Sequence, residues 1–346
     1  MKTNAIKKPI NLFIALLALA SCNPMNTIDM TNWEFTPKDE NNIKIGILQP
    51  VEHDALSKAR EGFIKALDTA GYKDGQNITI TYSNANGVSS DQNTLAKNLT
   101  SSCDLTLGIG TGASQALHSA QINSGSTNPI LFTAVTDAVD AELVSSNTNP
   151  GGYITGTSDA NPVEEQINLI KECLPSATKL GIIYTQSETN SEVQANQAKA
   201  AAEEMGLEVK ISTCTDSTDL SATARDLCSK VDALYIPTDN NIAANMNTVK
   251  AAADTNKILV VCGEEGMLKN GGQITLSIDY FELGRKCGNI AVSIIKGEKK
   301  PNEIPVATMA KEECVYVMSS KNLADAGITL PDLVKTKFTD ISAGEN

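Results

Sequence analysis

A strand motif near the start of the chain recurs in its second half. Residues 44–48 read Lys-Ile-Gly-Ile-Leu, and residues 179–183 read Lys-Leu-Gly-Ile-Ile. A helical pattern follows each copy and stops at a glycine, Gly71 in the first half and Gly206 in the second. A strand-and-helix unit that repeats in this way predicts two similar α/β domains.

Two further pairs of segments extend the repeat in the same order. Residues 104–108 match 232–236, and residues 130–135 match 258–262, all with the apolar pattern of buried strands. The fold class that this order predicts is α/β, with two Rossmann-like lobes built on parallel sheets. A chain of 346 residues is long enough to bury both cores.

The remaining elements place the bounds of the two lobes. A long helix at 281–296 and two short strands near 304–308 and 313–317 are too little for a third domain. We therefore predict that the chain crosses between the lobes three times, near residues 176, 278 and 304. The predicted bounds are 43–176 plus 279–303 for lobe 1 and 177–278 plus 304–335 for lobe 2. A hinge of several segments suits closure around a ligand.

The first 21 residues have the pattern of an export signal. Three lysines precede an apolar run at 12–20, which is too short to span a bilayer. The run ends in Leu-Ala-Ser-Cys, and this resembles the lipobox of bacterial lipoproteins, in which Cys22 would become the acylated N-terminus. The alternative is a plain secretory signal. We predict a flexible tether at 22–42, because the segment is polar and has no helix or strand period.

Charge and cysteine usage exclude several classes of function. The chain carries 41 acidic and 28 basic residues and has no cluster of lysine and arginine, so no nucleic-acid partner is expected. Seven of the eight cysteines follow Cys22, and no Cys-x-x-Cys pair occurs. We expect mostly free thiols, no metal site and a monomer.

A turn after the strand at 104–109 has the chemistry of an anion seat. Its sequence is Gly-Thr-Gly-Ala-Ser at 110–114, where a helix begins. Free N–H groups at that helix start, with the hydroxyls of Thr111 and Ser114, suit a ligand's carboxylate. The matching strand in the second half ends in Pro-Thr-Asp-Asn at 237–240. Because ligands of open α/β sheets bind beyond the carboxyl ends of strands, we expect the two turns to face one cleft.

Enzyme motifs do not fit this chain. The glycines at 108, 110 and 112 lack the Gly-x-Gly-x-x-Gly spacing of a dinucleotide site, and no P-loop occurs. Ser114 is not in a Gly-x-Ser-x-Gly elbow, and the chain has only two histidines, His53 and His118. We expect neither an enzyme nor a cofactor.

Eight ordered motifs resemble a known family, the substrate-binding lipoproteins of ABC importers related to tryptophan and tyrosine uptake. They span about 43 to 310 and read Gly46-Ile-Leu-Gln-Pro-Val-Glu-His53, Glu61-Gly-Phe63, Gly71-Tyr72, Gly110-Thr111, Phe132-Thr-Ala-Val-Thr-Asp137, Thr155-Gly-x-Ser-Asp159, Pro237-Thr-Asp-Asn240 and Asp279-Tyr-x-x-Leu-Gly284. The resemblance implies a type I periplasmic-binding-protein fold, a ligand closed between two lobes, and delivery to a membrane permease. One departure is Asp137-Ala138, where the family usually has Asp-Pro.

The sequence therefore indicates an extracytoplasmic, lipid-anchored solute-binding protein for an amino acid, with an aromatic one favoured. A sugar or a purine is an alternative ligand, and a receptor ectodomain that serves a signalling partner is an alternative class. The candidate ligand-binding residues are Gln49, Glu52, His53, Thr111, Gly112, Ser114, Val135, Thr136, Asp137, Asp159, Tyr184, Asn190, Ser191, Thr238, Asp239, Asn240, Glu264 and Asp279.

Roles within this set follow from charge. Thr111 and residues 135–136 are predicted to hold the ligand's carboxylate with neutral donors. Asp239 is predicted to bind the ammonium, with Glu264 or Asp279 as helper, because an unpaired buried charge is costly. Tyr184 is placed to stack on an aromatic ring. The competing interpretation is that Asp239 only caps a helix at 241–254.

Overall fold

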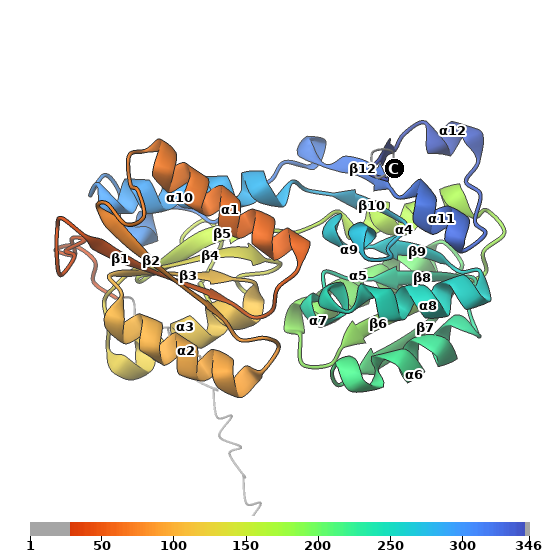
Figure 1. The fold of residues 1–346 in the computed structure, drawn as a ribbon, viewed down its shortest axis with the longest axis horizontal. Coiled ribbons are helices and arrows are strands. Elements are labelled where there is room, and N and C mark those ends of the chain that lie inside the picture. The colour runs from red at the N-terminus through yellow and green to blue at the C-terminus, as the bar shows by residue number, and fades with distance from the viewer. Residues whose placement is uncertain (1–27, 343–346) are drawn as a thin grey trace, which may run out of the picture.

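Two α/β lobes lie side by side in the computed structural model, which describes residues 28–342 (Figure 1). The predicted export signal and Cys22 lie outside the described residues. Each lobe is a twisted sheet with helices on both faces, as the alternating strand and helix patterns predict.

Lobe 1 holds a six-stranded sheet in the order β11-β5-β4-β3-β1-β2, with every pair of neighbours parallel. Its strands are β1 (Ile43–Gln49), β2 (Ile78–Asn84), β3 (Leu105–Ile109), β4 (Ile130–Val135), β5 (Ile154–Ser158) and β11 (Ala307–Thr308). Its helices are α1 (Asp54–Thr69), α2 (Ser89–Ser102), α3 (Thr111–Ser124) and α10 (Tyr280–Ile295). In Figure 1, α1 and α10 cover one face of this sheet and α2 and α3 the other.

Lobe 2 holds a seven-stranded sheet in the order β13-β12-β10-β9-β8-β6-β7, in which only the β10–β12 pair is antiparallel. Its strands are β6 (Lys179–Thr185), β7 (Glu208–Cys214), β8 (Ala233–Ile236), β9 (Leu259–Cys262), β10 (Ile274–Ser277), β12 (Val315–Met318) and β13 (Thr339–Asp340). Its helices are α4 (Val163–Cys173), α5 (Thr189–Glu204), α6 (Ser217–Cys228), α7 (Asn240–Ala244), α8 (Met246–Asn256), α9 (Gly266–Lys269), α11 (Ser320–Asp325) and α12 (Asp332–Lys335).

The strand order confirms the internal repeat. Lobe 1 runs β2-β1-β3-β4-β5 and lobe 2 runs β7-β6-β8-β9-β10, so equivalent strands take equivalent places. Gly71 and Gly206 end the chain's two equivalent helices, α1 and α5, and both have a positive φ, which glycine adopts without strain.

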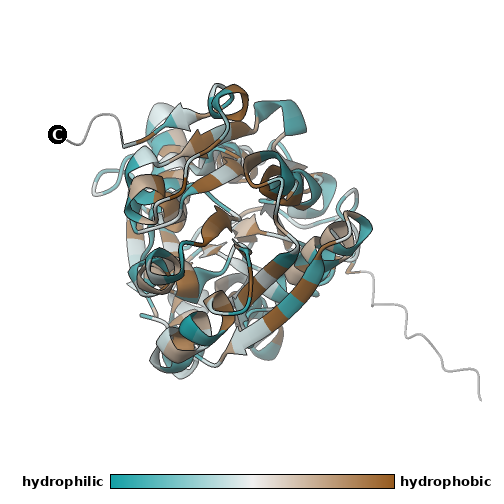
Figure 2. Cartoon of the chain, turned by 90° about the vertical axis from the view of Figure 1, so that its right-hand side faces the viewer, coloured by the Kyte–Doolittle hydropathy of each residue, from teal (hydrophilic) through white to brown (hydrophobic). Residues whose placement is uncertain are grey.

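Central strands carry the cores of both lobes. Every residue of β3, β4, β8 and β9 is buried, which fits the near-continuous apolar runs of parallel strands covered on both faces. In Figure 2, brown strands lie inside, and teal colours much of the outer helix surface.

Two glycines of the family motifs allow α1 and α10 to touch. A Cβ on Gly62 would collide with the carbonyl oxygen of Phe281, and one on Gly284 would collide with that of Ala59. This contact ties α10 to lobe 1, although α10 directly follows strand β10 of lobe 2 in the sequence. The chain must therefore pass from lobe 2 to lobe 1 between β10 and α10.

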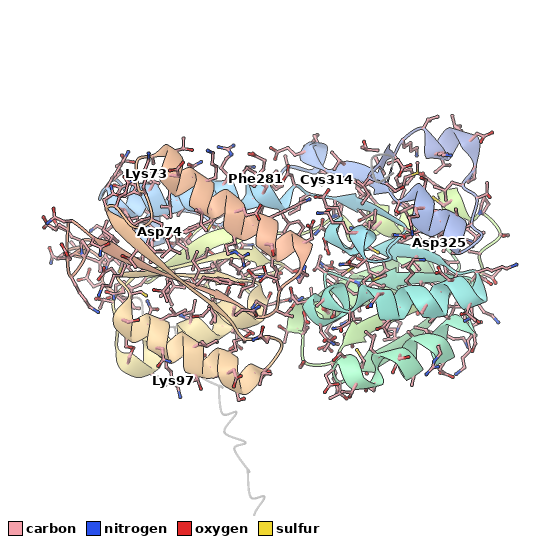
Figure 3. All side chains as sticks on the ribbon, viewed as in Figure 1. Lys73, Asp74, Lys97, Phe281, Cys314 and Asp325 are labelled. Atoms are coloured by element: carbon pink, nitrogen blue, oxygen red, sulfur yellow. The ribbon has the colours of Figure 1, made fainter. Side chains whose placement is uncertain are left out.

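The crossings differ in part from the predicted bounds. The first lies between β5 and α4, at 159–162 rather than near 176, because α4 packs against the lobe 2 core through Ile167 and Ile170. The second lies at 278–279, near the predicted place. The third lies at 309–314 rather than near 304, because β11 still pairs with β5 in lobe 1. Figure 3 labels Phe281 and Cys314, which lie beside the two later crossings.

The predicted tether is too long at its C-terminal end. Trp33 and Phe35 pack against the lobe 1 core, and the indole nitrogen of Trp33 donates to the carbonyl of Thr127 at 3.0 Å. The two aromatic side chains bury apolar surface that a purely polar tether would lack.

Several general features of residues 28–342 bear on function. All seven cysteines in this range are free thiols, and six are buried. The range contains no group of three or more side chains arranged to hold a metal ion. Its helices are all too short or too polar to cross a bilayer.

Candidate functional site

A narrow cavity of about 10 Å³ lies where the strand ends of the two lobes meet. Among the described residues, no lysine or arginine lines it. Its walls are His53, Ala55, Leu56, Ala134, Thr136, Asp159 and Tyr280 from lobe 1 and the first crossing, and Asn190, Thr238, Asp239, Asn240, Ala243, Glu264 and Met267 from lobe 2. We call this space the interlobe cavity. Eight of the predicted residues meet here, namely His53, Thr136, Asp159, Asn190, Thr238, Asp239, Asn240 and Glu264.

Hydrogen bonds and ion pairs hold the lobes together around the interlobe cavity. The Nε2 atom of His53 lies 3.1 Å from Oδ1 of Asn240, and the hydroxyls of Thr136 and Thr238 are 3.3 Å apart. Lys58 of α1 pairs with Glu265, and Lys269 of α9 pairs with Asp54. The lobes are therefore closed on each other.

His53 carries an unused acceptor in this closed state. The amide nitrogen of Asn240 donates to Glu188 at 2.7 Å, so its Oδ1 accepts from Nε2–H of His53. This assigns the neutral tautomer with a bare Nδ1, which has no partner among the described residues. Burial lowers the pKa of His53, which favours the neutral ring.

Asp159 links the interlobe cavity to the first two crossings between the lobes. Its Oδ2 accepts from the phenol of Tyr280 at 2.8 Å, and its Oδ1 accepts from the Thr136 hydroxyl at 3.2 Å. The amide of Asn161 also donates to the Tyr280 oxygen. Residues of the first crossing are thus bonded to the residue that follows the second. Burial raises the pKa of Asp159, and these donors oppose that shift.

Asp239 is engaged within lobe 2. Its Oδ2 accepts from the backbone N–H of Thr185 at 2.6 Å. Its Oδ1 accepts from the Thr185 hydroxyl and from the N–H of Ile242, each at 2.9 Å. The bond from Ile242 caps α7. The predicted helix at 241–254 is in fact two helices, α7 and α8, which break at Asn245. Burial raises the pKa of Asp239.

Glu264 is the least satisfied carboxylate in the cavity. It is 2% exposed and follows β9. Its Oε2 accepts from the N–H of Gly266, whereas its buried Oε1 has no partner in the described chain. Burial raises its pKa to about 8.

Glu188 is a residue that sequence reasoning missed. It precedes α5, is partly buried, and accepts from the backbone N–H groups of Asn240 and Asn241 at 2.9 and 2.8 Å. Burial and the nearby Asp239 raise its pKa. The only feature of the sequence that could have pointed to Glu188 is its position directly before a helix. Glu188 lines the neighbouring space rather than the interlobe cavity itself. The wall residues of the interlobe cavity that were missed are Ala55, Leu56, Ala134, Ala243, Met267 and Tyr280.

The start of α3 faces a second space, of about 140 Å³, beside the interlobe cavity. Gly112 lines it together with Asn190 and Asn240, which also line the interlobe cavity. Thr111 is buried, and its hydroxyl has no partner in the described chain. The Ser114 hydroxyl donates instead to the carbonyl of Gly110 at 2.8 Å, inside the first turn of its own helix.

Other predicted residues lie outside the interlobe cavity. Gln49 and Glu52 both bind Arg60, and this ion pair lowers the pKa of Glu52 to about 2. Val135 is in the lobe 1 core and Tyr184 packs on the lobe 2 core. The remaining three residues bind backbone groups. Asp137 and Asp279 each accept from N–H groups of the residues that follow them, and the Ser191 hydroxyl donates to the carbonyl of Thr238.

Comparisons with known proteins give one family. Residues 44–341 match the model of the ABC transporter substrate binding protein family. The chain is 37% identical over 342 residues to a tyrosine-binding protein of Clostridioides difficile, covering 97% of this chain and 98% of the relative. These relatives are binding proteins rather than enzymes.

Two solved structures differ in how well they overlay. The ABC domain in complex with L-Trp from Streptococcus pneumonia has 35% identity and a TM-score of 0.80, over 86% of this chain and 98% of that one. The ligand-free, open structure of a substrate-binding protein with adhesive properties from Clostridium difficile has 36% identity but a TM-score of 0.64, over 86% and 99%. The better overlay with the tryptophan complex fits the closed arrangement of the lobes.

Proposed function

Because the chain belongs to the ABC transporter substrate-binding proteins, we propose that it is a lipid-anchored protein that closes on an aromatic amino acid and delivers it to a membrane permease. Proteins of this family work outside the cytoplasm. The observation that carries the proposal is the closed interlobe cavity, walled by three buried acids and by neutral donors, in a chain related to tyrosine and tryptophan binders.

The chemistry of the walls suits a zwitterion. Asp159, Asp239 and Glu264 supply negative charge for an ammonium, and an amino acid brings that charge with it. The Thr238 hydroxyl and the helix start at Thr111 are the proposed donors for its carboxylate, because the Thr136 hydroxyl already donates to Asp159. Neutral donors avoid burying a lysine or arginine beside the ligand.

Alternatives rest on weaker grounds. Sugar and polyol binders share the fold at 14 to 17% identity, which supports the architecture alone. A neutral sugar would bring no positive charge to a cavity walled by three buried acids. A receptor ectodomain would use the same cavity, and its closed form would bind a signalling partner instead of a permease.

Native mass spectrometry tests the ligand class. Protein purified from its host is sprayed under native conditions and then denatured, and the released small molecule is identified. Tyrosine or tryptophan is the expected result. A retained sugar or purine would overturn the amino-acid assignment.

The lipid anchor has its own test. Cys22→Ala should leave the fold intact and move the protein from the membrane fraction to the soluble fraction, since Cys22 is the proposed acylation site. Detection of lipid on the N-terminus of the variant would contradict the proposal.

A further inference from the structure

We propose that Glu264 is the residue that receives the ligand's ammonium, so that Glu264 makes the site select molecules with a free amino group. The inference rests on the proposed function and deepens it, because it names the atom that reads the amino group. It also replaces Asp239, the residue that charge alone favours, with a different acid of the same lobe.

The three acids of the interlobe cavity differ in what their oxygens already bind. Asp239 accepts three hydrogen bonds from Thr185 and Ile242. Asp159 has a hydroxyl donor on each oxygen. Glu264 alone keeps one oxygen, Oε1, that is buried and has no partner in the described residues. Oε1 therefore lacks a partner among these residues in either protonation state, and a ligand's ammonium would supply a donor to it once the carboxyl group has lost its proton.

The position of Glu264 couples recognition to closure. It lies between β9 and α9, and Gly266, whose N–H binds its Oε2, lies against Ala55 and Asp54 at the start of α1. The next residue, Glu265, pairs with Lys58 of lobe 1. An ammonium on Oε1 would therefore sit beside the surface where the lobes touch.

Titratable groups around Glu264 come from both lobes. Asp54 and Glu265 disfavour its charged form, and each is paired with a lysine. The other neighbours, His53, Asp159, Asp239, Cys262 and Tyr280, line the same cavity or interact with Glu264 electrostatically. With its pKa raised to about 8, Glu264 is mostly protonated at pH 7 in the empty protein. Binding of an ammonium there should therefore release close to one proton.

Titration calorimetry of the wild-type protein and Glu264→Gln provides the test. The probes are L-tyrosine, L-tryptophan and desaminotyrosine, which lacks the amino group. Glutamine keeps an acceptor for the Gly266 N–H but carries no charge. We expect the variant to bind both amino acids at least tenfold more weakly, about 1.4 kcal/mol, with little change for desaminotyrosine. Glu204→Gln, at an exposed site on α5, is the matched control and should bind as wild type.

The outcomes separate the two proposals. Amino-acid binding by wild type with equal affinity in Glu264→Gln would overturn this inference and leave the proposed function standing. A wild-type protein that binds no aromatic amino acid would overturn both. If the variant melts early, wild-type titrations with tyrosine and desaminotyrosine decide the matter, because equal affinity for the two would contradict a site that selects the amino group.

Discussion

The loop after β3 in lobe 1 and the loop after β8 in lobe 2 are equivalent by fold, yet they are built differently. The first, at Gly110 and Thr111, is neutral, and its threonine hydroxyl is buried without a partner. The second, at Thr238 and Asp239, is charged, and its carboxylate accepts three hydrogen bonds from its own lobe. Among the described residues, equivalent places in the repeat thus carry a buried hydroxyl without a partner in lobe 1 and a carboxylate with three hydrogen bonds in lobe 2.

The difference shows that acids in the cleft can have two roles, which are to stabilise a lobe and to bind the ligand. An acid can be present in a ligand cavity chiefly to hold its own lobe, as Asp239 holds β6 to α7. The residue that reads the ligand is then an acid with an unused oxygen, as Glu264 has. The comparison gives predictions that can be ordered by size.

Asp239 should give the largest effect, and on folding. Asp239→Ala leaves the buried N–H groups of Thr185 and Ile242 without acceptors, and we expect a loss of about 2 to 4 kcal/mol in unfolding free energy. Asp239→Asn turns an NH₂ toward one of these donors, so about 1 to 3 kcal/mol should be lost despite asparagine's quality as a cap. Chemical denaturation measures both. Wild-type stability of the alanine variant would show that the lobe 2 network is dispensable.

Stability should also depend on pH through lobe 2. Burial raises the pKa of Glu264 from 4.5 to about 8, and burial with the nearby Asp239 also raises the pKa of Glu188. Between these limits the native state holds protons that the unfolded chain has released, so stability is greatest near pH 4.5 and falls as pH rises through 8. The ligand-free protein should melt several degrees lower at pH 8 than at pH 5. Glu264→Gln should flatten this slope, and a rising slope in the wild type would contradict it.

Thr111 should give the smallest effect on folding. Thr111→Val replaces a buried hydroxyl that lacks a partner with a methyl group of similar size, so unfolding free energy should stay within about 0.5 kcal/mol of wild type. Affinity for tyrosine should fall roughly threefold or more, about 0.7 kcal/mol, if the hydroxyl binds the carboxylate. Calorimetry that returns wild-type affinity would remove Thr111 from the site.

The repeat and the order of elements could be predicted from sequence because periodicity and apolar runs report burial directly. The wall residues at strand ends, such as Thr136 and Thr238, followed from the rule that ligands bind beyond those ends. Partners could not be predicted. Nothing in the pattern around Asp239 reveals that Thr185 binds it from another strand, or that Glu264 keeps a free oxygen.

The crossings show the same limit. Residues 163–173 read as an amphipathic helix that either lobe could take, and only its packing partners assign it to lobe 2. The Tyr280 phenol has no local signal for its bond to Asp159, because the two residues are 121 positions apart. Long-range polar pairs depend on three-dimensional placement, which local periodicity does not encode.

Small-angle scattering with and without L-tyrosine or L-tryptophan tests the central claim most directly. The lobes of this structure are closed and joined at His53 and Asn240, and we predict that without ligand they separate in solution. Saturating amino acid should then lower the radius of gyration and bring the scattering curve to that calculated for the closed form. Curves that coincide with and without either amino acid at saturation would contradict a protein that closes on this ligand.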